Sequence, residues 1–433
     1  MNERRRLRQG LALSLGLALQ CAQFSLAEGE MKITGIRFER VEGEFTGEWA
    51  VQERQVGALD LYPEYRQRGV SGDVPGSATP NVPQSHEPWP IAALYLHIDT
   101  DEGITGTYGG IEPDQAFQIE RRIKPHLLGQ DPLATERLWD IMARHDRHGR
   151  RGYMMMAISA VDIALWDIRG KAANLPAYRL LGGPTRQTVP AYASCLGMPI
   201  DPERLVSRAQ ALKAEGYVAQ KWFFRYGPGD GREGLLKNVA MVRLLREAVG
   251  DEVDLMFDAW MGWDVPYALE MCRRIAPYGP RWLEEPLAVD RLSGYAELRR
   301  QGAVPIASGE HEYTRWGCKA LLDAQGVDVF QADPDWTGGI SELTKIIALC
   351  SAYDKPVVPH GHSVAPALHV VAAQSPAVCP LVEFLLVYLE QKQWFHQERI
   401  APVHGQVALP QRPGVGIALD ESRIMRRREV SWS

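Results

Sequence analysis

The alternation of hydrophobic and polar residues changes character near residue 190. Before that point, residues 31–43 and 91–110 alternate with a period of two, and a turn at Asp101 divides the second segment into a predicted hairpin. Helical periodicity follows in the segments 114–128, 131–144 and 154–176. Strands followed by helices predict an α+β unit at the start of the chain.

Two of these helices carry specific expectations. Asp131 and Pro132 are predicted as the N-cap and the first helical residue of the segment 131–144. The helix over 154–176 is predicted to be amphipathic, because four apolar residues recur at helical spacing. The residues that line its apolar face are Ile158, Val161, Leu165 and Ile168.

Beyond residue 190, short β-rich runs alternate with helix-like segments. The runs are 189–194, 217–223, 253–257, 281–284, 304–308, 327–331, 355–359 and 381–385. Such βα repeats predict an α/β fold, a (β/α) barrel of the TIM type, whose active sites lie at the carboxyl ends of the strands. An open doubly wound sheet is the other interpretation, but no G-x-G-x-x-G follows the first run.

Composition and charge exclude some classes of function. The chain has 433 residues, of which 45% are hydrophobic and 24% charged, as in an ordinary soluble protein of one large or two medium domains. A net charge of −6 and a pI near 6.0 argue against nucleic acid, which needs a basic face. Beyond residue 30 no apolar run is long enough to cross a membrane. We therefore expect a small-molecule partner, and neither nucleic acid nor a membrane.

The first 30 residues have the pattern of a signal peptide. Arginines from Arg4 to Arg8 precede an apolar stretch over 11–19, and small residues stand at 25–27. The other interpretation is a misassigned extension ahead of a start at Met31. Five scattered cysteines beyond residue 30 favour a reducing compartment over a disulfide framework. We expect a cytoplasmic protein, or a periplasmic one if residues 1–30 act as a signal.

Acidic residues end three consecutive β-rich runs. Asp258, Glu284 and Glu310 follow one another at intervals of 26 residues, about one βα unit each. A barrel would bring them onto one rim, where they would repel each other unless a cation lay between them. Three oxygen ligands with room for water or substrate suit Mg²⁺. The spacing therefore predicts a magnesium site.

Two further residues continue the same series. Asp333 and His360 end the next two runs, at intervals of 23 and 27 residues. The carboxylate would fix the imidazole tautomer and make His360 a general base. Lys221 on the second run and Glu383 on the eighth complete the rim. Together they predict metal-assisted removal of a proton next to a carboxylate, with Lys221 stabilising the charge that develops.

Several motifs carry a family resemblance. The chain resembles the enolase superfamily, mandelate racemase subgroup, in "LMFDAW", "WLEEP", "SGEHEY", "QADPDWTGG" and "VPHGHS". The resemblance implies Mg²⁺ as the cofactor, Glu284 rather than Glu285 as the ligand, and a homo-oligomer. It also implies an N-terminal α+β capping domain over 31–165, a modified barrel over 166–390, and a C-terminal segment over 391–433 that returns to the cap.

Within the subgroup, the second β-rich run is informative. Racemases of this type carry K-x-K there, with the second lysine as a base, whereas this chain has Lys221-Trp222-Phe223. A single base is consistent with dehydration, and the chain is similar to acid-sugar dehydratases of the L-rhamnonate dehydratase type. In that reaction His360 would remove the C2 proton and protonate the departing 3-hydroxyl. The alternatives are a racemase or epimerase, a sugar-acid-binding protein without turnover, and a metallohydrolase, which usually needs several histidine ligands.

The resemblance extends to substrate contacts. Arg66 in "YPEYR" resembles a "KYR" element of the rhamnonate enzymes, although the histidine of their early cap loop has no counterpart in 43–57. In the family, the residue at the position of Glu383 binds or polarises the substrate carboxylate. The remaining residues expected to line the pocket are Trp260, His311, Trp336 and His362. The Gly- and Pro-rich segment 69–88 is expected to be a lid or a disordered loop.

Overall fold

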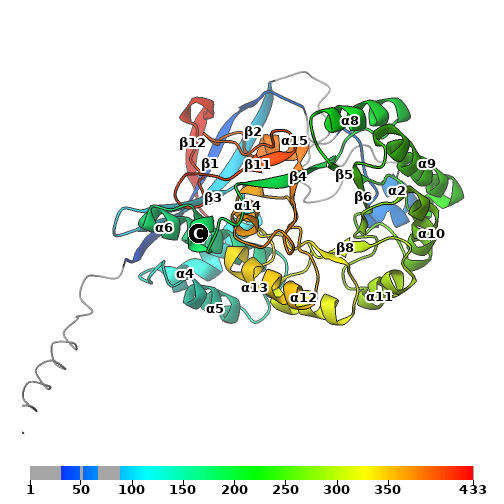
Figure 1. Cartoon of the computed structure of the whole chain (residues 1–433). Coiled ribbons are helices and arrows are strands. Elements are labelled where there is room, and N and C mark those ends of the chain that lie inside the picture. Colours follow the sequence, from blue (N-terminus) through cyan, green and yellow to red (C-terminus); the bar gives the residue numbers. More distant parts are fainter. Residues whose placement is uncertain (1–30, 49–51, 67–87, 433) are drawn as a thin grey trace, which may run out of the picture.

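A four-stranded antiparallel sheet is built from the two ends of the chain. The computed structural model describes residues 31–48, 52–66 and 88–432 (Figure 1). The sheet has the order β12-β1-β2-β3. Its strands are β1 (Ile33–Phe45), β2 (Trp89–Thr100), β3 (Thr105–Gly109) and β12 (Arg426–Val430). Because β12 pairs with β1, the C-terminal segment returns to the N-terminal sheet.

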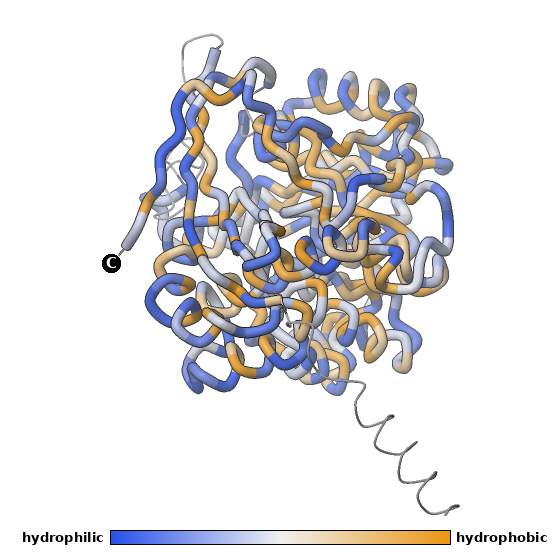
Figure 2. The backbone as a smooth tube through the Cα atoms, turned by 90° about the vertical axis from the view of Figure 1, so that its left-hand side faces the viewer, coloured by the Kyte–Doolittle hydropathy of each residue, from blue (hydrophilic) through white to orange (hydrophobic). Residues whose placement is uncertain are grey.

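The predicted hairpin forms one side of this sheet, with β3 at the edge. Strands β2 and β3 pair antiparallel, and the Gly103 N–H donates to the Thr100 carbonyl in the turn between them. Buried residues such as Phe38 and Val41 alternate along β1 with more exposed ones. Figure 2 shows hydrophobic and hydrophilic residues interchanging along the chain in the same way. One face of the sheet is therefore available to pack against helices.

Helix α6 (Tyr153–Ala173) lies between this sheet and the barrel helices. The prediction of an amphipathic helix is wrong, because Ser159, Asp162 and Asp167 are as buried as the apolar face. The cause is tertiary packing, because α6 is covered on more than one side. It packs against β3 and α3 (Pro113–Gln118) and also against α13 (Gly339–Ala352). Polar residues on this helix therefore bond to neighbouring elements rather than to water.

The other N-terminal helices differ from expectation in detail. The segment 114–128 consists of α3, a π-helical turn η2 (Ile119–Ile123) and α4 (Lys124–Leu127). Helix α5 (Thr135–His145) begins later than predicted. Pro132 is not its first helical residue, and Asp131 accepts a hydrogen bond from the Leu133 N–H ahead of the helix. The Asp-Pro pair forms a turn that precedes the helix.

Parallel strands form a curled sheet with the order β10-β4-β5-β6-β7-β8-β9. They are β4 (Thr188–Ser194), β5 (Ala219–Phe223), β6 (Asp254–Asp258), β7 (Trp282–Glu284), β8 (Ile306–Ser308), β9 (Val329–Phe330) and β10 (Val382–Leu385). The pairing of β10 with β4 brings the last strand beside the first, which rules out an open doubly wound sheet. The run 355–359 was expected as a full strand, but it forms only a bridge between Val357 and Phe330.

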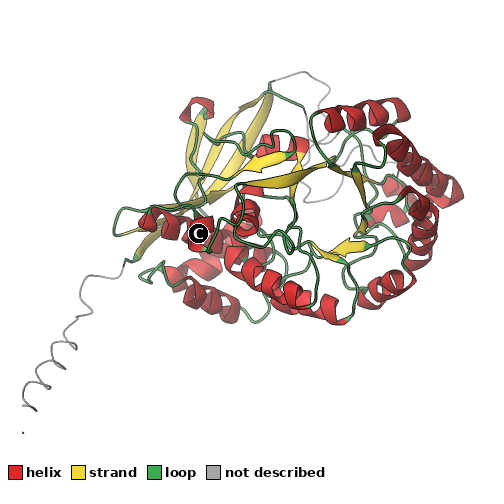
Figure 3. Ribbon diagram, in the orientation of Figure 1, coloured by secondary structure: helices red, strands yellow, loops and turns green. Residues whose placement is uncertain are grey.

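Helices surround the parallel strands on the outside (Figure 3). They are α8 (Pro202–Ala214), α9 (Gly231–Val249), α10 (Val265–Ile275), α11 (Leu292–Gln301), α12 (Thr314–Asp323), α13 and α14 (Val364–Ala372). Helix α15 (Leu386–Lys392) follows β10 and instead lies against the N-terminal sheet, where Lys392 meets Gly110. Shorter elements are η1 (Ala58–Leu61), α2 (Pro63–Arg66), α7 (Ala177–Leu180), η3 (Pro228–Asp230), η4 (Ala276–Tyr278), β11 (Gln406–Ala408) and η5 (Glu421–Arg423).

The inside of the barrel is filled by side chains. One apolar cluster comprises Tyr192, Ala219, Met256, Trp282, Ala307, Val358 and Leu381. These residues come from successive strands, as in the layered interior of a (β/α) barrel. The barrel is therefore a packed support, and its chemistry is confined to the rim at the strand ends.

The remaining expectations concern boundaries and segments. Helix α6 continues across residue 165, where the capping domain was expected to end. Residues 1–30 and most of the segment 69–88 lie outside the described residues. In the described part of the chain, no helix combines the length and the apolar character needed to cross a bilayer. The cysteines described are free and buried.

Asp162 in α6 generates a prediction about stability and pH. Burial raises its pKa to about 7, while its Oδ2 accepts a 2.9 Å hydrogen bond from the Ser341 N–H at the start of α13. The folded state then holds a proton that the unfolded chain releases near pH 3.8, so the unfolding free energy falls as the pH rises from about 4 to about 7. Thermal unfolding of the wild type and of Asp162→Asn would be measured at pH 5 and pH 8. We expect the unfolding free energy of the variant, relative to that of the wild type, to be roughly 1–4 kcal/mol higher at pH 8 than at pH 5.

The same measurement can contradict this view of Asp162. A difference between variant and wild type that does not change with pH would mean that Asp162 is already ionised in the folded protein at pH 5.

Candidate active site

Three acidic side chains end neighbouring strands of the barrel. Asp258, the last residue of β6, is in register with Glu284, the last residue of β7, and Glu310 follows β8 by two residues. All three are buried, with at most 4% of the surface exposed. Burial raises the pKa of each acid. The neighbouring acids raise these pKa values further: Glu310 raises the pKa of Asp258, Asp258 that of Glu284, and Glu284 that of Glu310. Negative charge is therefore concentrated where water is largely excluded.

Lys221 on β5 supplies a positive charge to this group. Its Nζ lies 3.3 Å from Asp258 Oδ2 and 2.9 Å from Glu383 Oε1, and it also forms an ion pair with Glu284. Burial opposes the charged form, but the carboxylates around it hold the pKa of Lys221 well above its usual value. One ammonium among several carboxylates leaves the rim with an excess of negative charge.

The donor chemistry of this rim fits a hard divalent cation. Asp258, Glu284 and Glu310 offer only carboxylate oxygens, which Mg²⁺ prefers. Burial, and then the neighbouring acids, raise the pKa of each of the three carboxyls, and a bound cation would favour their charged form. The residues present therefore fit Mg²⁺, both by ligand type and by charge.

A histidine–aspartate pair stands next to the acidic group. Asp333 follows β9, and its Oδ2 lies 2.5 Å from Nδ1 of His360, which follows the bridge at Val357. The other ring nitrogen, Nε2, lies 3.6 Å from Glu310 Oε2. Burial lowers the pKa of His360, but Glu310 and Asp333 outweigh it and raise the pKa to about 10. Asp333 thus orients the ring, and Nε2 lies on the side of Glu310.

Glu383 on β10 bonds to groups of the protein itself. One of its oxygens forms the ion pair with Lys221, and the other accepts a 2.8 Å hydrogen bond from the Gly361 N–H. Gly361 directly follows His360 in the chain. Glu383 therefore connects the lysine to the backbone that carries the histidine.

A cavity of about 820 Å³ opens over this rim. The rim residues that line it are Phe223, Asp258, Trp260, Glu310, Trp336, His360 and His362. The Trp336 ring lies among three imidazoles, with its centroid 5.2 Å from that of His311, 4.9 Å from His360 and 5.2 Å from His362. Trp260, at a positive φ of 41°, is held by a 2.8 Å bond from its N–H to Asp258 Oδ1.

Two of the expected substrate contacts lie elsewhere. Arg66 donates to the Gly229 carbonyl and is not among the described residues that line the cavity. His311 touches Trp336 but is also absent from the lining, because its Nδ1 lies 2.8 Å from Glu285 Oε2. The structure therefore brings Trp260, Trp336 and His362 to the cavity, and it does not bring Arg66 there.

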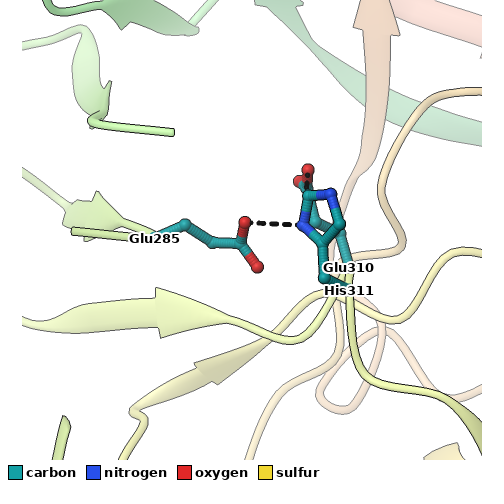
Figure 4. Close-up of side chains that lie close together, drawn as sticks. All are labelled: Glu285, Glu310 and His311. Atoms are coloured by element: carbon teal, nitrogen blue, oxygen red, sulfur yellow. Dashed lines mark hydrogen bonds and ion pairs between the residues drawn. The ribbon is translucent and has the colours of Figure 1, made fainter. Parts of the chain in front are cut away.

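A second group of potential ligands shares one residue with the first. Ligand atoms of Glu285, Glu310 and His311 all lie within 4.8 Å of one another (Figure 4). Against the effect of burial, His311 lowers the pKa of Glu285, and Glu285 raises that of His311 to about 9. A protonated imidazole cannot ligate a metal, and this pair is already neutral overall. The all-carboxylate group around Glu284 lacks this neutralisation, but among the described residues its three acids are not a group whose ligand atoms all lie within 4.8 Å of one another, so its role as the cation site stays a prediction.

Sequence reasoning missed Asp335, Tyr388 and Lys392. Tyr388 and Lys392 line the cavity, and Asp335 bonds to both His362 and Lys392. A signal for Asp335 is present in the sequence, because Asp335 and His362 repeat the 27-residue separation of Asp333 and His360. No local pattern marks Tyr388 or Lys392.

Comparison with known proteins agrees with this architecture. Residues 204–423 match the family described as enolase C-terminal domain-like, and residues 91–182 match the mandelate racemase / muconate lactonizing enzyme N-terminal domain. A protein named L-rhamnonate dehydratase from Saccharopolyspora erythraea is 36% identical over 378 residues, which cover 84% of this chain and 89% of that protein.

Solved structures show the same fold. The structure of L-rhamnonate dehydratase from Gibberella zeae matches with a TM-score of 0.78 at 28% identity. The match covers 92% of this chain and 96% of the Gibberella chain, and that enzyme has also been solved in complex with Mg. A racemase from Streptomyces coelicolor A3(2) with bound magnesium has a TM-score of 0.73 at 27% identity, with coverage of 90% and 98%.

A curled parallel sheet capped by an antiparallel sheet, with acids at the ends of successive strands, defines the class of protein. It is an enzyme with the fold of the enolase superfamily. Within that superfamily the chain belongs to the mandelate racemase / muconate lactonizing enzyme family.

The two overlapping ligand groups can be separated by substitution. Removal of a metal's outer partners typically lowers affinity 10–100-fold, so loss of a direct ligand should cost roughly 100-fold or more. We expect Glu284→Gln to weaken Mg²⁺ binding by that amount in titration calorimetry, and Glu285→Gln to weaken it much less. The reverse order would assign the cation to Glu285, Glu310 and His311, and equal melting temperatures would show that both variants fold.

Proposed function

We propose that this protein is a Mg²⁺-dependent dehydratase of a sugar acid, which removes the C2 proton and the C3 hydroxyl to give a 2-keto-3-deoxy acid. The proposal is supported by relatives named L-rhamnonate dehydratase and by the magnesium complex of a structural neighbour. It is also supported by an all-carboxylate rim beside a histidine that faces the cavity.

The observation that carries the proposal is that the cavity presents one group able to transfer a proton at C2, whereas a racemase of this type would need two. His360 reaches the cavity with Asp333 behind it. At the end of β5, the position next to the acids is occupied by Phe223, which lines the cavity and has no titratable group that could transfer a proton. Lys221, two residues earlier, is held among carboxylates and is not part of the lining. One base suits elimination better than inversion at C2.

Asp258, Glu284 and Glu310 would hold the metal ion. When bound, Mg²⁺ would neutralise the substrate carboxylate and the negative charge that develops there as the C2 proton leaves. The Lys221 ammonium, fixed by Glu383 beside the same acids, would add a second positive charge. With Glu310 engaged by the cation, its effect on the pKa of His360 would weaken, which favours the neutral imidazole that a base requires.

His360 would then act twice. Its Nε2 would take the C2 proton while Asp333 holds Nδ1–H and stabilises the imidazolium. The electron pair of the C2–H bond would form the C2–C3 double bond, and the C3–O bond would break. The imidazolium would return its proton to the departing hydroxyl, which leaves as water. The resulting enol would tautomerise to the 2-keto acid.

The neighbouring residues would place the substrate for this step. The Trp336 ring lies 4.9 Å from the His360 ring, at a tilt of 36°, and would limit the orientations of the sugar chain. Trp260, fixed to Asp258, would form part of the wall beside the cation. Glu383 would act as a positioning residue, because it holds both Lys221 and the backbone after His360.

The first test removes the base. His360→Asn should abolish 2-keto acid formation and deuterium exchange at C2 in D₂O, and should leave Mg²⁺ affinity within about threefold, since the three acids remain in place. His404→Asn is the matched control, because His404 is exposed and has a positive φ of 51° that asparagine tolerates. Residual turnover in His360→Asn would exclude His360 as the base.

The substrate panel decides between dehydration and its alternatives. With Mg²⁺, wild-type protein should convert one acid of a panel of five- and six-carbon aldonic and deoxyaldonic acids into a 2-keto acid. Exchange at C2 with inversion and without keto acid would instead establish an epimerase. Binding without either reaction would establish a sugar-acid-binding protein.

A further inference from the structure

A second histidine–aspartate pair lies beside the first. Asp335 and His362 stand two residues after Asp333 and His360, and their Oδ2 and Nδ1 atoms are 2.7 Å apart. The Asp335 N–H donates to Asp333 Oδ1 over 2.6 Å, so the two pairs are fixed to each other. The Trp336 ring contacts both histidines. The proposed dehydration uses only one of these pairs.

Residues from two other parts of the chain, α15 and β3, complete this second pair. Lys392 of α15 donates to Asp335 Oδ2 over 3.0 Å, and Tyr388 Oη lies 2.8 Å from His362 Nε2. From the N-terminal sheet, the Tyr108 hydroxyl donates to Asp335. We call these residues, Tyr108, Asp335, His362, Tyr388 and Lys392, the outer cluster.

The outer cluster faces the same cavity as His360. His362, Tyr388 and Lys392 belong to its lining. Lys392 lies against Gly110, where an added Cβ would come within 2.9 Å of the lysine Cε. Because Gly110 follows β3, this contact places the cluster on the side of the cavity formed by the N-terminal sheet. Its polar groups are therefore held in place before any ligand arrives.

The charges of the cluster largely cancel. Burial opposes ionisation of Asp335, but Lys392 outweighs it and lowers the pKa of the carboxyl; Asp335 in turn raises the pKa of Lys392. The cluster consists of one ion pair, one histidine and two phenols and has little net charge. It therefore favours a neutral hydroxyl of a ligand over a second carboxylate of the ligand. A methyl group placed here would leave polar atoms without partners, which costs binding free energy.

We propose that the outer cluster is a subsite for the hydroxyl at the far end of the sugar acid. A substrate with C2 at His360 would extend past Trp336 to Tyr388 and Lys392. The preferred acid would then carry a hydroxyl on its last carbon, where a 6-deoxy acid such as L-rhamnonate carries a methyl group. This inference rests on the proposed function, since it assumes a sugar acid at His360.

Binding without turnover tests the subsite. In the His360→Asn background with Mg²⁺, titration calorimetry would compare each six-carbon aldonate of the panel with its 6-deoxy counterpart, for example L-mannonate with L-rhamnonate. We expect the hydroxylated acid to bind about tenfold more tightly, the value of one hydrogen bond. Tyr388→Phe and Lys392→Met should each remove most of this preference and leave the affinity for the 6-deoxy acid within about twofold.

A matched control is available in Tyr353→Phe, which removes a hydroxyl that donates to Asp323 over 2.8 Å and is not part of the cavity lining. This variant should leave both affinities unchanged, and thermal unfolding would show that all variants fold. Titration of a six-carbon aldarate would be added to the comparison. Three outcomes would overturn the proposal: equal or tighter binding of the 6-deoxy acid, equal loss for both acids in Tyr388→Phe, or tightest binding of the aldarate, which has a terminal carboxylate. Wild-type protein that binds with the expected preference but forms no keto acid would refute the dehydratase and retain the subsite.

Discussion

The buried ammonium of Lys221 is the interaction on which the site depends. It lies among Asp258, Glu284 and Glu383, on three different strands, in a place from which water is largely excluded. Without it, acids at neighbouring strand ends would repel each other with little screening. With it, the rim is still short of positive charge. The same arrangement thus stabilises the end of the barrel and leaves negative charge that a divalent cation would compensate.

The polar residues above this rim are arranged in successive layers. The acids and Lys221 are grouped at the strand ends, His360 and Asp333 stand beside them, and the Trp336 ring contacts both His360 and His362 of the outer cluster. Each layer is fixed by hydrogen bonds to the next, such as that from the Asp335 N–H to Asp333. The proposed reaction at His360 and the proposed subsite at the outer cluster would therefore share one rigid framework.

The barrel and the rim could be predicted from the sequence because both depend on a repeat. Each βα unit contributes a buried run and then one polar residue, so Asp258, Glu284 and Glu310 could be found by counting. Features that depend on tertiary packing could not be found in this way. The polar face of α6 is buried by elements on opposite sides, and Tyr388 and Lys392 meet Asp335 from a distant part of the chain. Arg66 was assigned by resemblance to a motif, and the local turn at Gly229 holds it away from the cavity.

The pairing of β1 with β12 has a consequence for the order in which the protein is completed. Phe38 in β1 is opposite Val430 in β12, which is synthesised after all the strands of the barrel. During synthesis the outer edge of β1 must therefore remain unpaired until the barrel has been translated, and exposed strand edges are where chains associate wrongly. Such a distant pairing also makes closure of the sheet intrinsically slow. The N-terminal sheet can therefore reach its full width only after all the strands of the barrel have been synthesised.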